Sequence, residues 1–235
     1  MMVRKTLSSR SPIKTLEKNI TGGLGPGTVG VFASRKGVGK TACLVQIALD
    51  RLLEEKPVIH VSYSSRVDYI ISWYEEIFKN LSTRENLKSA MDVHDRIIRN
   101  RVIMNFRQEG MKTSQVLKSL EALLGPGNFP ARTIIVDGFN FYLPCQEDLE
   151  LFKKFAGQHQ LEIWFSCSLK GDDPLFDEHG IPFILKHHLG VIDIIITLEH
   201  DDSKVKLHLV KDHDRLPGKK LRLQLDPQTL LLARA

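Results

Sequence analysis

The chain has 235 residues, enough for one α/β domain with a sizeable core. Hydrophobic residues make up 42% and charged residues 26%, which excludes a disordered or fibrous protein, and no apolar run approaches the roughly 18 residues that a membrane-spanning helix needs. The net charge of +5 favours an anionic partner, such as a nucleotide, a nucleic acid or an acidic protein surface, without choosing among them.

The start of the chain and its cysteines both bear on where the protein works. The basic start, MMVRKTLSSRSPIK, has no apolar stretch after its charges and does not resemble a secretory signal, so we expect residues 1–14 to form a flexible basic tail and residues 15–235 a single domain. Cys43, Cys145 and Cys167 show no C-x-x-C or metal-binding spacing, which favours a cytoplasmic protein over a disulfide scaffold. No local pattern supports a Ser-His-Asp or Cys-His nucleophile.

Strand and helix patterns alternate along most of the chain. Apolar and β-branched runs predict strands at residues 29–33, 58–63, 102–106, 133–139 and 161–168. Helical periodicity predicts helices between them, at residues 41–54, 67–80, 85–100, 113–124 and 148–158. The chain then changes to short strands, in VIDIIITL, KVKLHLV, KLRLQLD and TLLLA. We therefore predict an α/β fold, with a mostly parallel sheet, helices on both faces and antiparallel strands added at one edge.

The stretch SRKGVGKTA nearly matches the phosphate-loop pattern G-x-x-x-x-G-K-[ST], and it lies between a predicted strand and a predicted helix. In such a loop, backbone N–H groups and the start of the helix form a concave anion site. Two glycines supply conformational freedom, a lysine reaches the terminal phosphates and a threonine hydroxyl binds Mg²⁺. The candidate nucleotide-binding residues are Ser34, Arg35, Lys36, Gly37, Val38, Gly39, Lys40, Thr41 and Ala42.

Ser34 stands where the pattern has its first glycine. That position often needs a backbone shape that a side chain disfavours, so we expect a cost of about 1 kcal/mol and weakened, but not abolished, binding. Arg35 and Lys36 add positive charge beside the phosphates, where they either assist binding or face water.

In the stretch TIIVDGF, Asp137 directly follows the β-branched run TIIV. Because ligands of open α/β sheets bind at the carboxyl ends of the strands, this carboxylate is expected to hold Mg²⁺ together with Thr41. The alternative is an ordinary Asp-Gly turn, and the nearby phosphate loop favours the metal role. The predicted metal residues are therefore Thr41 and Asp137.

These motifs resemble the RecA/KaiC-like P-loop ATPases, the group that includes RadA proteins and ring-helicase ATPase domains. The resemblance rests on GG-x-x-P-G-T at residues 22–28, on the loop as a Walker A motif, on TIIVDGF as a Walker B motif, and more weakly on the closing strands. It implies a fold of the RecA type, ATP and Mg²⁺ as ligands, assembly with identical or related subunits, and nucleic acid as a further partner. It also implies that Lys211 or Arg215 reaches a neighbouring subunit's nucleotide.

One departure from the family concerns the catalytic base. The second strand of the family usually ends in glutamates that polarise the attacking water, whereas this chain has Ser64 and Ser65 there. Asp68 and Glu75 follow nearby, but the sequence does not show that either side chain points toward the phosphate. We therefore leave the catalytic residues unassigned and consider Ser166 or Ser168 as hydrogen-bond donors to a γ-phosphate.

Two main hypotheses remain. The first is a slow ATPase that couples nucleotide state to assembly or to DNA transactions. The second is a nucleotide-binding module that does not hydrolyse ATP and regulates a protein partner. A DNA-binding accessory protein is a third, supported only by the basic charge and by the habit of the family that the chain resembles.

Overall fold

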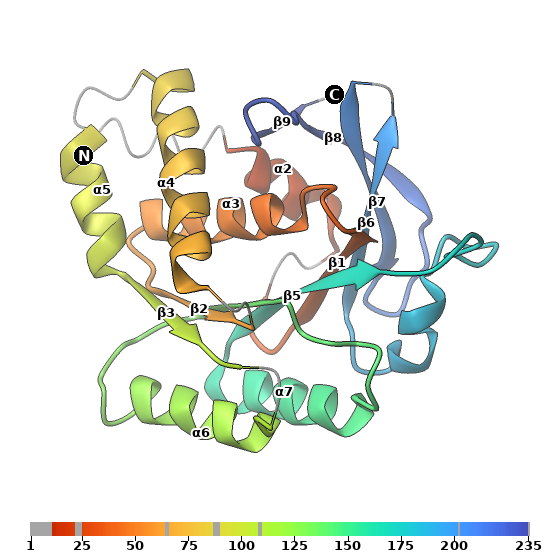
Figure 1. Ribbon diagram of the computed structural model, residues 1–235, viewed down its shortest axis with the longest axis horizontal. Helices are drawn as coiled ribbons and strands as arrows, with labels where there is room; N and C mark the ends of the chain where they lie inside the picture. The colour runs from red at the N-terminus through yellow and green to blue at the C-terminus, as the bar shows by residue number, and fades with distance from the viewer. Residues whose placement is uncertain are drawn as a thin grey trace.

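The computed structural model describes residues 11–21, 25–63, 66–86, 90–107, 110–201 and 203–234. These residues place nine strands in one sheet, in the order β3-β2-β4-β5-β1-β6-β7-β8-β9 (Figure 1). The six strands from β3 to β6 run parallel, and β7, β8 and β9 are antiparallel. Helices cover both faces, so the predicted α/β fold class is confirmed.

The parallel strands contain the β-branched and apolar runs of the sequence. They are β1 (Val29–Arg35), β2 (Val58–Ser62), β3 (Arg101–Asn105), β4 (Thr133–Asp137), β5 (Glu162–Leu169) and β6 (Ile194–Asp201). The central strands are buried on both faces, which is why their sequences are almost continuously apolar instead of alternating. The antiparallel strands, β7 (Lys204–Asp212), β8 (Lys219–Leu225) and β9 (Leu232–Arg234), complete the sheet.

The helices divide between the two faces according to the direction of each crossover. On one face lie α3 (Lys40–Leu53), α4 (Val67–Arg84) and α5 (Ala90–Arg99), and on the other lie α6 (Thr113–Leu124), α7 (Gln146–His159) and the short 3₁₀ helix η1 (Phe183–His188). Right-handed crossovers require this division, because the chain moves one way from β1 to β3 and returns the other way from β3 to β6. The helices that follow β1 and β4 therefore leave to opposite faces, and a crevice opens at the carboxyl ends of these strands.

An additional helix, α2 (Pro12–Asn19), shows that the predicted tail over residues 1–14 was too long. Its amino end is capped by Ser11, whose Oγ accepts from the Ile13 amide at 3.2 Å. Leu16 is fully buried against the core on the α3 side, and Glu17 pairs with Arg51 of α3 at 2.7 Å. Residues 12–14 thus belong to a packed helix. Residues 1–10 lie outside the described chain, as do the two glycines that open the motif at residues 22–28.

The remaining differences from the predicted elements are at boundaries. Helix α4 continues to Arg84, and the helix expected over residues 85–100 begins at Ala90 after residues 87–89, which are not described. The strand expected in TLLLA is limited to β9, because Leu230 has a φ of +58° and turns the chain before it. No helix in the described part of the chain combines the length and apolar composition that crossing a bilayer requires.

Candidate functional site

The loop that joins β1 to α3 depends on two glycines with left-handed backbone. Gly37 has a φ of +84° and Gly39 a φ of +123°, values that side chains disfavour. A Cβ on Gly39 would also lie 2.2 Å from Leu225 Cδ2, so this position requires glycine for space as well. Gly39 is the N-cap of α3, whose first-turn N–H groups have no partner inside the helix. The loop therefore has the backbone geometry that an anion site at a helix start requires.

Ser34 fits the loop without the backbone cost expected from the missing glycine. It belongs to β1 and is not among the described residues with positive φ, so its side chain causes no strain of that kind. The residue is 1% exposed, and its hydroxyl donates to the Arg35 carbonyl at 3.1 Å. The expected penalty of about 1 kcal/mol is therefore wrong, because it assumed a backbone shape that side chains disfavour, whereas Ser34 lies in an ordinary strand.

The Lys40 side chain lies back across its own loop. The residue is 6% exposed, and its ammonium donates to the Ser34 carbonyl at 3.0 Å, to Ser34 Oγ at 3.2 Å and to the Arg35 carbonyl at 2.9 Å. Burial lowers the pKa of Lys40, an effect that the nearby Asp137 carboxylate opposes. An anionic phosphate oxygen is a stronger acceptor than these carbonyls, so the lysine is already placed for a ligand that could displace them.

Thr41 and Asp137 meet at the start of α3 and the end of β4. Thr41 Oγ1 donates to Asp137 Oδ2 at 2.9 Å, although 96 residues separate the two in sequence. The other carboxylate oxygen accepts from Ser166 of β5 at 2.5 Å, and Ser166 Oγ itself accepts from the Gly138 amide at 2.9 Å. Of the two serines considered from the sequence, Ser166 thus holds Asp137 in place.

This pair of oxygens suits a hard divalent cation. Magnesium prefers oxygen ligands and usually takes one or two from protein, with the rest from phosphate and water. Within the described residues, no cluster of three or more His, Cys, Asp or Glu side chains could hold a metal by itself. Thr41 and Asp137 therefore fit Mg²⁺ as part of a metal–phosphate site.

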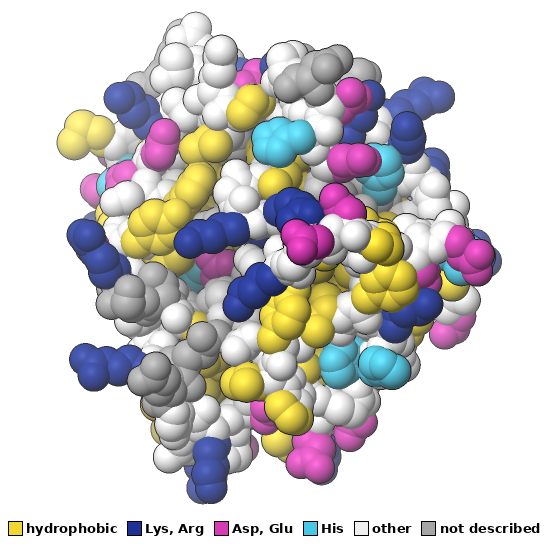
Figure 2. All heavy atoms as spheres, turned by 45° about the vertical axis from the view of Figure 1, so that its right-hand side comes forward, with side chains coloured by type: hydrophobic (Ala, Val, Ile, Leu, Met, Phe, Trp, Pro, Cys, Tyr) yellow, Lys and Arg dark blue, Asp and Glu magenta, His cyan; other side chains and the backbone are white. Residues whose placement is uncertain are grey.

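Cavities lie on both sides of the loop. Near Asp137, the described residues enclose a cavity of about 160 Å³, and none of those that line it is Asp or Glu: they are Gly138, Phe139, Asn140, Phe141, Tyr142, Ser166, Ser168 and Lys170. On the β6 side, a cavity of about 810 Å³ borders Arg35 and Val38 of the loop and is walled by Leu198, His208 and Leu216 among others. Figure 2 views the molecule from that side and shows apolar side chains gathered among charged and histidine side chains.

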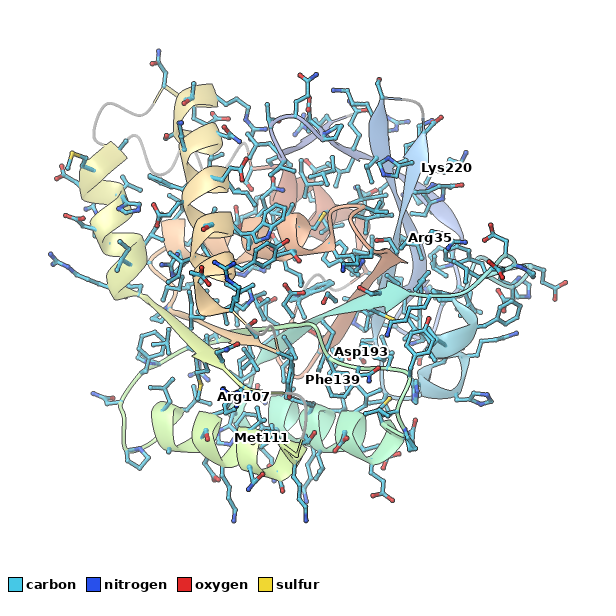
Figure 3. All side chains as sticks on the ribbon, in the orientation of Figure 1. Arg35, Arg107, Met111, Phe139, Asp193 and Lys220 are labelled. Carbon is cyan, nitrogen blue, oxygen red and sulfur yellow. The ribbon has the colours of Figure 1, made fainter. Side chains whose placement is uncertain are left out.

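Arg35 connects the phosphate loop to the segment that follows β5. Its guanidinium donates to the Gly171 carbonyl at 2.9 Å and to Asp173 Oδ1 at 3.1 Å. In Figure 3, Arg35 lies near the tip of β1, where that segment passes. The side chain is half-exposed, so it forms part of the rim of the larger cavity.

The carboxylates near the end of β2 are engaged elsewhere. Ser64 and Ser65 lie outside the described residues. Asp68 pairs with Arg66 at the exposed start of α4, and Glu75 Oε2 is 2.6 Å from His94 Nε2 on the surface between α4 and α5. Both acids lie in α4, within the helix predicted over residues 67–80, and these contacts hold them away from the loop.

Lys211 lies away from the phosphate loop of its own chain, and the role toward a neighbouring subunit's nucleotide that the resemblance implied stays a prediction. It pairs with Ile195 of β6 near the amino end of β1, whereas the phosphate loop follows the carboxyl end (Figure 3, where Asp193 marks the start of β1). The residue is 8% exposed, its ammonium donates to the His213 carbonyl, and burial lowers its pKa. Arg215 is exposed on the connection to β8 and stays a candidate for that role.

Two features of the site have no local signal in the sequence. The wall of the larger cavity comes from residues between 173 and 180 and between 197 and 218, far from the loop in the chain, and the position of Lys40 depends on carbonyls that no residue pattern reveals.

The chain was also compared with known proteins. Comparison with protein-family models gives no match to the chain, and comparison with curated proteins gives none either. The RecA/KaiC-like resemblance therefore rests on the motifs quoted above.

Proposed function

We propose that this protein binds the triphosphate of Mg²⁺–ATP in the loop formed by residues 34–42. The observation that carries the proposal is the Thr41–Asp137 contact of 2.9 Å, which lies next to a buried Lys40 on a loop with two left-handed glycines. The basic charge of the chain and the resemblance to RecA/KaiC-like ATPases support the same ligand.

Each group has a distinct part in this proposal. Lys40 exchanges its bonds to loop carbonyls for bonds to phosphate oxygens, and the first-turn amides of α3 contribute further donors. Thr41 and Asp137 hold the Mg²⁺ ion, which neutralises phosphate charge when bound. Ser166 positions Asp137 for this role through its hydrogen bond to Oδ1.

The positions of the two cavities suggest how the bound nucleotide is oriented. The metal residues lie toward β4, so we place the terminal phosphates there and the nucleoside in the cavity of about 810 Å³ toward β6. That volume is within the usual range for small-molecule sites, about 300–1,000 Å³. Adenine as the base follows from the resemblance. Leu216→Ala, at the cavity rim, should weaken ATP binding about threefold and leave tripolyphosphate binding unchanged, because only ATP carries a nucleoside.

Hydrolysis is expected to be slow. No carboxylate is found among the described residues that line the cavity beside Asp137, and a missing general base costs a factor of about 10²–10⁴ in rate. We therefore propose that nucleotide occupancy, more than turnover, controls the interaction of this protein with a partner, of which a second copy of the chain is the first to test.

A second candidate is an ATPase that assembles with a neighbouring subunit and with DNA. The observation that favours it is the small cavity beside Asp137 and Ser166, which offers room for a water molecule whose base would come from that neighbour. Phosphate release that rises more than linearly with protein concentration would distinguish this candidate from the binding module.

The experiment that tests the metal site is a calorimetric titration with ATP, carried out once in the presence of Mg²⁺ and once with EDTA in place of Mg²⁺. Thr41→Val keeps the shape of the side chain but removes its oxygen, and it should weaken binding about 10-fold or more with Mg²⁺ while changing little with EDTA. Thr229→Val, an exposed threonine away from the loop, is the matched control and should bind as the unaltered protein does. Equal Mg²⁺–ATP affinity of Thr41→Val and the unaltered protein would contradict the proposal.

A further inference from the structure

A second group of reactive side chains lies on the opposite face of the sheet from α3, at the start of α7 (Figure 1). Cys145 is the N-cap of α7, and its Sγ is 3.5 Å from Nε2 of His188 in η1, 43 residues later. Nδ1 of the same imidazole is 2.6 Å from Gln146 Oε1, and Gln146 Nε2 is 2.6 Å from Glu150 Oε1. The four side chains therefore form one continuous hydrogen-bonded series.

The order of donors and acceptors in this series determines where the protons lie. The Glu150 carboxylate can only accept, so the Gln146 amide turns its NH₂ group toward Glu150 and its oxygen toward His188. An amide oxygen also only accepts, so Nδ1 of His188 carries the hydrogen. In the neutral imidazole Nε2 is then unprotonated, and it faces the Cys145 thiol as a proton acceptor.

The surroundings keep both groups neutral at rest. Burial raises the pKa of the Cys145 thiol, with a smaller contribution from Asp148, and burial lowers the pKa of His188, as does its neighbour His187. The thiol therefore needs a base to become a nucleophile, and the adjacent imidazole is free to act as one. A thiol beside a histidine whose second nitrogen is held by an amide oxygen is the arrangement by which cysteine nucleophiles are activated.

The other two cysteines serve as internal references. Cys43 and Cys167 are 0% exposed, and burial raises the pKa of each to about 12, whereas Cys145 is 3% exposed. In the described residues no hydrogen bond joins either of them to a histidine, so only Cys145 combines a base with some access from solvent. An exposed fraction this small leaves no room for a protein substrate, so a small molecule is the reactant to test.

We propose that Cys145 is a modification site, a thiol that small peroxides oxidise with His188 as general base. His188 Nε2 takes the thiol proton, and the sulfur attacks one oxygen of hydrogen peroxide. The S–O bond forms as the O–O bond breaks, and the departing hydroxide takes the proton from His188 and leaves as water. The sulfur is oxidised to a sulfenic acid and the peroxide is reduced, with no further co-reactant.

The test treats the intact protein with hydrogen peroxide, traps sulfenic acid with dimedone and measures each cysteine by peptide mass spectrometry. Cys145 should be labelled at least 10-fold faster than Cys43 and Cys167. A disulfide from Cys145 to another thiol, formed from the sulfenic acid, counts as the same result. Labelling of all three cysteines at one slow rate would overturn the proposal, and this comparison requires no variant.

Substitution separates the base from simple accessibility. His188→Phe should slow labelling of Cys145 about 10-fold or more, because it removes the proton acceptor while filling the same space. His187→Phe changes the adjacent exposed histidine and should stay within about threefold of the unaltered protein. His188→Ala should regain rate when free imidazole is added. An unchanged rate in a folded His188→Phe protein would also overturn the proposal.

Discussion

The conformation of the phosphate loop can be tested by comparing alanine at its two glycines. At Gly37 no atom lies within 4 Å of the position that a new methyl group would take, so Gly37→Ala should cost only the strain of a left-handed backbone, about 1–3 kcal/mol. At Gly39 the φ of +123° causes similar strain, and the new methyl would also meet Leu225 at 2.2 Å. Overpacking of this kind adds about 1–3 kcal/mol, so Gly39→Ala should be the more destabilising by about 2 kcal/mol.

Urea unfolding without nucleotide, followed by tryptophan fluorescence, measures this difference as a change in the free energy of unfolding. In a chain of this size it corresponds to a Tm about 4–8 °C lower for Gly39→Ala than for Gly37→Ala. A double-mutant cycle with Leu225→Ala should give a coupling of about 1 kcal/mol, because removal of Cδ2 relieves the contact. Equal losses at both glycines, or no coupling to Leu225, would refute the described loop geometry.

Two further predictions concern buried titratable side chains. Complete burial lowers the pKa of His60 from 6.5 to about 4. Between these pH values the unfolded chain therefore binds a proton that the folded chain does not. The free energy of unfolding should fall on the order of 3 kcal/mol as the pH drops from 6.5 to 4. His60→Gln should flatten this decline in urea unfolding at pH 7 and pH 4.5, and an unchanged slope would contradict the assignment. Arg51 makes two hydrogen bonds to buried Glu162, at 2.7 and 3.2 Å, so Arg51→Met should cost about 3–5 kcal/mol in the same assay. Adding Glu162→Gln should recover part of that loss, and a double variant no more stable than Arg51→Met would argue against the pairing.

Much of the fold was predictable because its strands carry strong local signals. The β-branched run before Asp137 marks β4, and its position next to a phosphate loop predicted that Asp137 and Thr41 would be close, as they are. Helix α2 was missed because PIKTLEKN has few apolar residues, and the helix is held by tertiary contacts of Leu16 and Glu17 that the sequence does not display.

The parts of the site that could not be predicted depend on contacts between distant segments or on backbone shape. Ser34 was expected to be strained because the pattern has glycine there, yet the strand simply continues through it. The burial of Lys211 reflects its register with β6, and the contact of Cys145 with His188 depends on how η1 packs against α7. Such contacts are set by the packing of whole elements, which local periodicity does not encode.

The most direct test of the central claim is a thermal melt of the purified protein with Mg²⁺–ATP, with phosphate release followed in the same sample and Lys40→Ala as the control. Because Lys40→Ala also loses bonds within the loop, each protein is compared with itself with and without ATP. At an ATP concentration 100 times Kd, binding stabilises the folded state by about 2.7 kcal/mol. The predicted result is a Tm rise of about 5–10 °C that Lys40→Ala lacks, with slow phosphate release. A melting temperature that does not respond to Mg²⁺–ATP would contradict the proposed nucleotide site.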